Sequence, residues 1–135
     1  MSLSLVRPYF EKCAKDLGFK VSDEAFSAES LARNSGKQAF ISLQPATTRK
    51  QQSHIEQTLR ISVKLFIGQS RQTKDLEKKG FEAGDEFVTS VFLSHRTSPF
   101  SRVVCTSLQP QPITTQNDNA VAVDLEFEAT VLSLT

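Results

Sequence analysis

Three carboxylates near the C-terminus could do chemistry, because they alternate with apolar residues in one stretch. In a β-strand Asp124, Glu126 and Glu128 would share one face, with neighbours about 7 Å apart. Paired carboxylates at that distance would suit an inverting glycosidase. We favour a solvated face with salt bridges to Arg60 and Lys64 on an adjacent strand, since no nearby sequence supplies a pocket that would tune a carboxylate. An acidic face that meets a basic face of another copy is a third interpretation.

The other chemistry-bearing residues form no catalytic or metal-binding motif. His54 and His95 are the only histidines, and neither has a Cys, Asp or Glu at metal-ligand spacing, whereas a zinc site needs three or four ligands. A G-x-S-x-G elbow for a nucleophilic serine is absent. Gly68-Gln69-Ser70 lacks the glycine spacing and the closing lysine of a phosphate loop. The sequence therefore predicts no catalytic residue, no metal, no cofactor and no enzymatic activity.

Two small basic clusters could contact an acidic partner or DNA that passes close by. Arg49 and Lys50 lie near His54, and Arg96 lies near Arg102. No aromatic residues interleave with Arg49 and Lys50, so stacking on a single strand is unsupported. Because 16 Lys and Arg oppose 15 Asp and Glu, for a net charge of +1, we interpret both clusters mainly as solvated loop residues.

The composition indicates one ordinary globular domain. The chain has 135 residues, of which 39% are hydrophobic and 23% charged, enough to bury a core without metal or disulfide. No apolar run approaches the roughly 20 residues of a membrane helix, and Met1–Pro8 lacks the layout of a signal peptide. We therefore expect synthesis in the cytoplasm, with Cys13 and Cys105 as buried free thiols. Ten Phe against one Tyr and no Trp favour packing and assembly over small-ligand recognition.

The element that must position these residues is the stretch Thr58–Gly68. Its odd-numbered residues from Leu59 to Ile67 are apolar, whereas Arg60, Ser62 and Lys64 are polar. This two-residue period is typical of a half-buried strand, which we expect at the centre of an antiparallel sheet.

The remaining elements follow from the spacing of apolar residues and from the turn-forming residues between them. Gly18 is predicted as a left-handed helix cap, and Lys20–Gly36 as an ordered connection. Gly80 and Gly84 would either pack a helix closely on the sheet or kink it. The expected helices are Leu3–Leu17 and Thr73–Leu93, the other strands Gln38–Leu43, Phe100–Leu108 and Val121–Val131, and the polar loops Gln44–His54 and Gln109–Asn119. We predict an α+β fold with an antiparallel sheet of about four strands and two helices packed on one face, in the order α-β-β-α-β-β.

The chain has a helix ending in Leu17-Gly18-Phe19, a strand at Ala39-Phe40-Ile41 and a last strand ending almost at the C-terminus. This order of elements resembles the tail-terminator (tail-completion) and head–tail joining proteins of long-tailed bacteriophages. The resemblance covers essentially the full chain and is one of order, length and pattern.

The resemblance implies a structural virion protein of the tail and neck. It would form a ring, commonly of six copies, that ends tube growth and provides the surface for head attachment. Its partners would be copies of itself, the tail tube protein and head–neck connector proteins, with DNA passing through the ring without sequence-specific binding and no membrane involved. The candidate contacts with subunits or tail are Arg49, Lys50, His54, Arg60, Lys64, Gln111, Ile113, Asp124, Glu126 and Glu128.

Two rival interpretations stay open. One is a small ligand-binding or hydrolytic α+β domain that uses the face of Asp124, Glu126 and Glu128. The other is a dimeric adaptor that uses a sheet edge.

Overall fold

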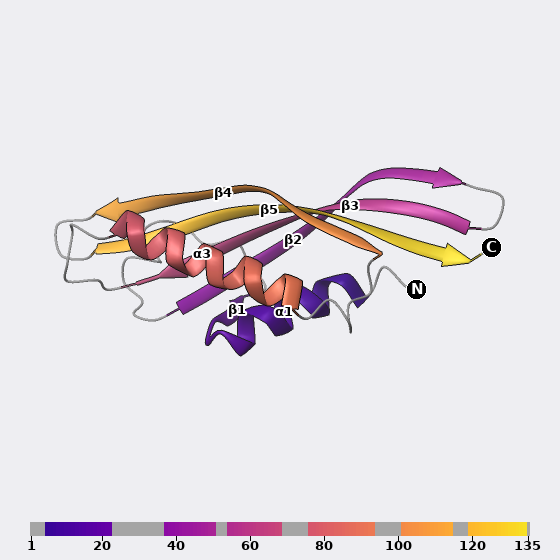
Figure 1. The fold of residues 1–135 in the computed structure, drawn as a ribbon. Helices are drawn as coiled ribbons and strands as arrows, with labels where there is room; N and C mark the ends of the chain where they lie inside the picture. Colours follow the sequence, from indigo (N-terminus) through magenta and orange to yellow (C-terminus); the bar gives the residue numbers. More distant parts are fainter. Residues whose placement is uncertain are drawn as a thin grey trace.

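The structure is a computed structural model, which describes residues 5–22, 37–50, 54–68, 76–93, 101–114 and 119–134. A twisted sheet forms one layer, and two helices lie along one side of it (Figure 1). The elements are α1 (Val6–Asp16), β1 (Lys20–Ser22), β2 (Lys37–Lys50), β3 (His54–Ile67), α3 (Leu76–Leu93), β4 (Arg102–Thr114) and β5 (Asn119–Leu134).

The strand order in the sheet is β1-β2-β3-β5-β4, which places β3 at the centre. The predicted α+β class, with both helices on one face, is therefore confirmed. The predicted count of four antiparallel strands is wrong, since the described part of the chain forms five and β1 pairs parallel with β2. The order becomes α-β-β-β-α-β-β. With only three residues, β1 is too short to show an alternation, which is why the sequence pattern did not reveal it.

The two-residue period of β3 separates a buried face from an exposed one, as predicted. Leu59, Ile61, Val63 and Leu65 are buried on the helix side, whereas Arg60 and Lys64 are exposed. Its neighbour β5 repeats the pattern with buried residues at odd positions from Val121 to Val131. One apolar face is thus available to the helices, while the other stays polar.

Both polar stretches that were predicted as loops belong largely to strands. Within Gln44–His54, β2 continues to Lys50 and β3 begins at His54. Within Gln109–Asn119, β4 continues to Thr114 and β5 begins at Asn119. A strand needs no apolar side chains where its backbone is paired with a neighbour, so polarity alone misplaced these boundaries.

The core between helices and sheet is built on three phenylalanines. Phe10 of α1, Phe87 of α3 and Phe127 of β5 are all 0% exposed. Ring centroids lie 5.2 Å apart for Phe10 and Phe127, 5.9 Å for Phe87 and Phe127, and 6.4 Å for Phe10 and Phe87. The hydroxyl of Tyr9 also donates to the carbonyl of Val91, which ties the two helices to each other.

The predicted cap of the first helix is confirmed. Gly18 has a φ of 88°, the left-handed region that suits glycine. Its N–H donates to the carbonyl of Lys15, and the N–H of Phe19 donates to that of Ala14. This is the Schellman arrangement, and it turns the buried Phe19 back onto the core.

The two glycines of α3 serve close packing. A Cβ at Gly80 would lie 2.6 Å from the Cβ of Pro110 and 2.9 Å from a methyl carbon of Val121. A Cβ at Gly84 would lie 2.8 Å from a methyl carbon of Leu108. The helix runs without interruption from Leu76 to Leu93, so the structure favours close packing over a kink.

We predict that Gly80→Ala destabilises the protein by about 1–2 kcal/mol, because the overpacking cost exceeds the gain of helix propensity. Urea denaturation would measure the change in the free energy of unfolding. Thr89→Ala, at an exposed position of the same helix, serves as the control and should be neutral or stabilising. A stability gain for Gly80→Ala would contradict the proposed close contact.

Candidate functional site

The face of the sheet that no described helix covers carries the charged residues identified in the sequence. We call it the open face. It begins at the row of Phe40, Lys64 and Asp124 and runs along the strands toward Glu56. Beyond its first row Phe66 and Ala122 are buried, so the open face does not include them.

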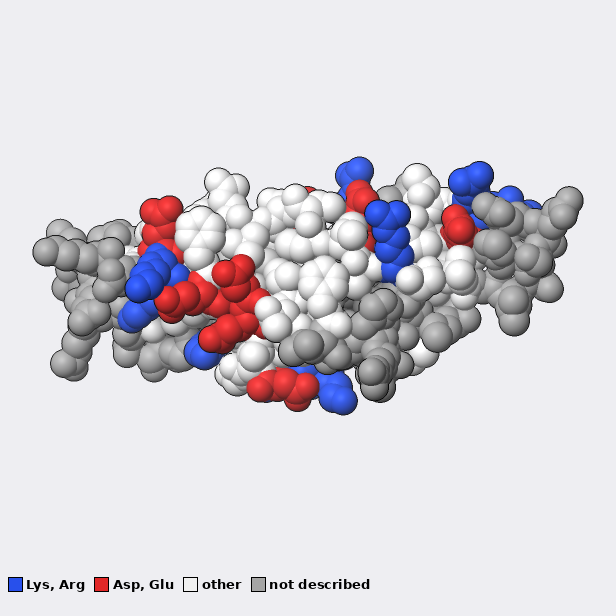
Figure 2. Space-filling model, viewed as in Figure 1, with Lys and Arg blue, Asp and Glu red and all other residues white. Residues whose placement is uncertain are grey.

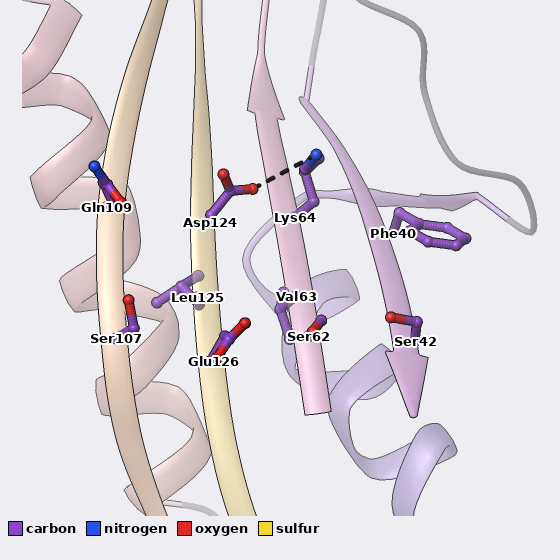
Figure 3. A pocket seen from close by; sticks show the side chains of 10 residues that line it. All are labelled: Phe40, Ser42, Ser62, Val63, Lys64, Ser107, Gln109, Asp124, Leu125 and Glu126. Carbon is purple, nitrogen blue, oxygen red and sulfur yellow. Dashed lines mark ion pairs between the residues drawn. The ribbon is translucent and has the colours of Figure 1, made fainter. Parts of the chain in front are cut away.

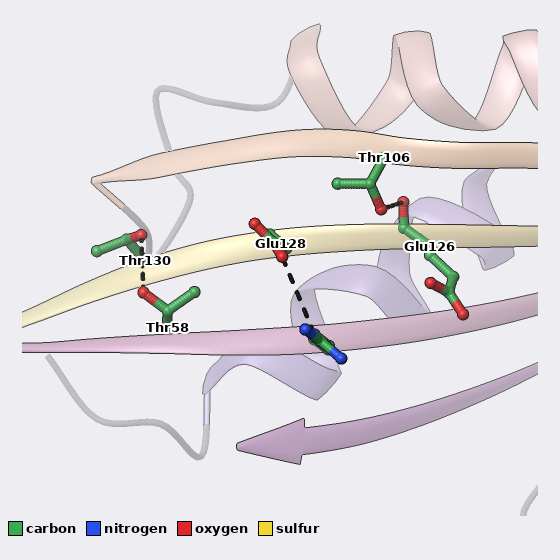
Figure 4. A network of polar contacts seen from close by, with 6 residues as sticks. Thr58, Thr106, Glu126, Glu128 and Thr130 are labelled. Atoms are coloured by element: carbon green, nitrogen blue, oxygen red, sulfur yellow. Dashed lines mark hydrogen bonds and ion pairs between the residues drawn. The ribbon is translucent and has the colours of Figure 1, made fainter. Parts of the chain in front are cut away.

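Strand register brings opposite charges together on the open face. Arg60 faces Glu128 and Lys64 faces Asp124 across β3 and β5. The Nε of Arg60 lies 4.0 Å from the Oε1 of Glu128 (Figure 4), and the Nζ of Lys64 lies 3.7 Å from the Oδ1 of Asp124 (Figure 3). All four side chains are between 37% and 65% exposed. The salt-bridge interpretation is therefore confirmed for two of the three carboxylates.

The third carboxylate has a different environment. Glu126 faces Ser62 on β3 and Ser107 on β4, and among the described residues no ion pair involves it. Its backbone carbonyl accepts a hydrogen bond of 3.2 Å from the Oγ1 of Thr106 (Figure 4). Since serine carries no charge, the Glu126 side chain remains an exposed negative charge between two ion pairs.

A shallow hollow of about 440 Å³ lies over this part of the sheet (Figure 3). Three serines share one of its rows with Glu126, whereas longer side chains form the neighbouring row of Phe40, Lys64, Asp124 and Gln109. Its lining residues are Phe40, Ser42, Ser62, Val63, Lys64, Ser107, Gln109, Asp124, Leu125 and Glu126. The hollow thus exposes hydroxyls, an amide and charges on a surface that is polar but not flat.

The structure brings only half of the predicted contact residues together. Arg60, Lys64, Asp124, Glu126 and Glu128 form the centre of the open face. The other five are spread toward the strand ends. Arg49 and Lys50 are exposed at the end of β2, Gln111 is exposed on β4, and the side chains of His54 and Ile113 lie outside the described residues.

Sequence reasoning missed the residues that shape the hollow. Ser62 could have been found from its place between Arg60 and Lys64 in the alternating stretch. Ser42, Ser107 and Gln109 gave no such signal. Only strand register brings Ser42 and Ser107 to the row of Ser62, and Gln109 to the row of Lys64. His95, which was rejected as a metal ligand, and Arg96 of the basic cluster with Arg102 lie outside the described residues.

Neither a metal centre nor a membrane-spanning helix is found in the described ranges. No three His, Cys, Asp or Glu residues there are grouped so that they could hold a metal ion. No helix among those residues is both long and apolar enough to cross a membrane.

The two cysteines differ in environment. Both are free thiols, Cys13 buried and Cys105 half-buried. The prediction of two buried thiols therefore holds fully only for Cys13. Burial raises the pKa of the Cys105 thiol above its usual value, which favours the unreactive protonated form.

Comparisons with known proteins give fold likenesses but no family. No protein-family model and no curated protein matches this chain. Among solved structures, it is similar to the type 4 fimbrial biogenesis protein PilO from Pseudomonas aeruginosa, with 12% identity over 96% of this chain and 70% of that one, at a TM-score of 0.42. It is also similar to the core region of PilO from the type IV pilus system of the same organism, with 16% identity over 83% and 95% of the two chains, at a TM-score of 0.36.

These findings overturn the resemblance to phage tail terminators. Both solved structures named above are pilus proteins, and neither comparison by sequence indicates a phage family. The predicted ring at a phage tail, the tail-tube and head–neck partners and the location in a virion are therefore wrong. The physical reason is that a helix-on-sheet order of elements recurs in unrelated proteins and carries no function by itself. At such low identity and TM-score, the PilO likeness does not assign a function to this chain either.

We predict that the coupling between Lys64 and Asp124 is weak and depends on salt. A double-mutant cycle with alanine at each position should give about 0.2–1 kcal/mol at low salt, because both groups are solvated. The coupling should fall at high salt through screening. A cycle between Lys64 and Glu77, which lies on α3 beyond the sheet, is the control and should give no coupling. A large coupling that salt leaves unchanged would contradict a solvated pair.

The raised pKa of Cys105 predicts slow alkylation at mild pH. Because the folded state favours the protonated thiol, the iodoacetamide rate at pH 8 should be below that of free cysteine and should keep rising with pH beyond the usual thiol range. Because folding raises the pKa of the Cys105 thiol, this group contributes most to the free energy of unfolding at pH values below its pKa in the unfolded chain. The contribution is lost as the pH rises through its pKa in the folded protein. Cys105→Ser isolates the buried Cys13 as the control. A rate at pH 8 equal to that of free cysteine would contradict the prediction.

Proposed function

We propose that this chain is a non-catalytic adaptor domain that binds a protein partner through its open face. The observation that carries the proposal is the one-sided cover of the sheet, where α1 and α3 lie on one face and charged and hydroxyl side chains occupy the other. Adaptor function was one of the alternatives from sequence, although there the contact was placed on a sheet edge.

The arrangement of charge favours binding over catalysis. General acid–base chemistry relies on carboxylates whose surroundings separate their pKa values, usually through burial. Here Asp124 and Glu128 each pair with a cation, and their side chains are 37% and 43% exposed. Exposed carboxylates that pair with cations are suited to surface recognition, where complementary charge gives specificity.

The edges are less suited to recognition than the face. The outer edge β4 contains Pro110 and Pro112, which carry no N–H for an added strand. At the other edge, β1 occupies the start of β2 by pairing with Gln38, Ala39 and Phe40. The open face, in contrast, offers a hollow into which a partner's side chains fit.

The surface on the helix side serves as a control for the open face. Acidic side chains gather there over α3 (Figure 2), and the exposed ones are Glu77, Glu82, Asp85 and Glu86. These charges share a helix surface rather than alternating with cations across strands. If recognition depends on the open face, changes over α3 should leave it intact.

A photo-crosslinking experiment tests the proposal. A photoreactive phenylalanine analogue replaces Gln109, an exposed residue that lines the hollow, or as control Glu82, an exposed residue of α3. We expect discrete crosslinked products in cells only from position 109. The partner, identified by mass spectrometry, should then bind the purified chain more weakly when Ser62→Trp fills the hollow without adding charge. Equal products from both positions, or none from position 109, would contradict the proposal.

A further inference from the structure

We infer that the partner is a second copy of this chain, packed open face to open face about a two-fold axis that runs parallel to the strands. This inference rests on the proposed function and specifies it. The axis passes over the boundary between β3 and β5, the two adjacent strands that carry most of the charge.

The pattern that leads to this inference is a pair of charge columns. Within the central rows of the open face, the cations Arg60 and Lys64 are on β3, whereas Asp124, Glu126 and Glu128 are all on β5. Because neighbouring strands lie about 4.8 Å apart, each column is one strand wide and the two are parallel. Such a surface is positive on one side of its midline and negative on the other.

A two-fold axis along this midline makes the surface complementary to itself. The rotation exchanges left and right but keeps the position along the strands, so β3 of each copy lies over β5 of the other. Lys64 then faces Asp124 of the second copy, and Arg60 faces Glu128 of the second copy. Each residue keeps its row because these pairs already share a row within one chain. An isologous contact of this kind closes as a dimer.

The same arrangement supplies cations to Glu126, for which the described residues show no ion pair. Glu126 would face Ser62 of the second copy, with Arg60 and Lys64 of that copy one row away on either side. Rows on one face of a strand are about 7 Å apart, within the reach of these long side chains. The small serines of the hollow leave room for them.

Other orientations of two open faces are disfavoured. An axis parallel to the sheet but perpendicular to the strands would place β3 over β3 and β5 over β5, so that like charges meet. Net charge does not oppose the contact, since the described open face has four cations and four carboxylates, namely Arg49, Arg60, Lys64 and Arg102 with Glu56, Asp124, Glu126 and Glu128.

A charge-swapped chain provides the test. The variant carries Arg60→Glu, Lys64→Glu, Asp124→Lys and Glu128→Lys, which keeps an ion pair at both intrachain positions and so protects the fold. Native mass spectrometry and sedimentation would be run on the wild type, the variant and their mixture. We expect each chain alone to give a mass near twice 15.0 kDa, with no mixed dimers, because swapped and wild-type columns repel each other in the proposed orientation.

Two half-swaps sharpen the result. Arg60→Glu with Lys64→Glu, and Asp124→Lys with Glu128→Lys, should each be monomeric alone and form one-to-one dimers when mixed. Thermal denaturation checks that both fold. Glu82→Lys with Asp85→Lys on α3 is the matched control, and it should dimerise and mix freely with the wild type. Dimer affinity of the wild type should fall as salt increases.

The outcomes separate this inference from the proposed function. Mixed dimers of swapped and wild-type chains, or a wild-type chain that stays monomeric at all concentrations, would overturn the two-fold arrangement. If the chain is monomeric while position 109 crosslinks to a different protein, the inference fails and the adaptor function stands. If it dimerises without any effect of the charge variants, and positions 109 and 82 crosslink equally, both fail.

Discussion

The alternation of apolar and polar residues in β3 and β5 is the constraint on which the rest of the structure depends. In these two strands, one set of side chains from Leu59 to Leu65 and from Val123 to Val131 is removed from water. Burial of this face is the main stabilising contribution. It also fixes register, because a shift by one residue would bury the charged set.

The helices respond to that apolar face in two ways. Phe10 and Phe87 place aromatic rings against Phe127, which supplies large, directional contacts. Gly80 and Gly84 remove side chains where α3 passes over β4 and β5, so that the helix backbone approaches the sheet closely. The ring of Phe87 and the close approach at Gly80 and Gly84 together determine how α3 lies on the sheet.

The open face is the consequence of this one-sided burial. Because both central strands keep their polar set on the same side, charges that the chain separates by 68 residues, those of Arg60 and Glu128, become neighbours. The proposed function rests on the charge pattern of this chain and not on its topology, because a fold by itself carries no function.

The sequence by itself determined the elements whose signals are local. The period of β3 and β5, the cap at Gly18 and the stripe of α1 need only neighbouring residues, and all were predicted. Tertiary structure decided the short parallel strand β1, the continuation of β2 and β4 through polar stretches, and the rows that pair Lys64 with Asp124 but leave Glu126 beside serines. These features depend on backbone hydrogen bonds to strands distant in the chain. A local pattern states which face a residue occupies, but only pairing between strands determines what lies opposite it.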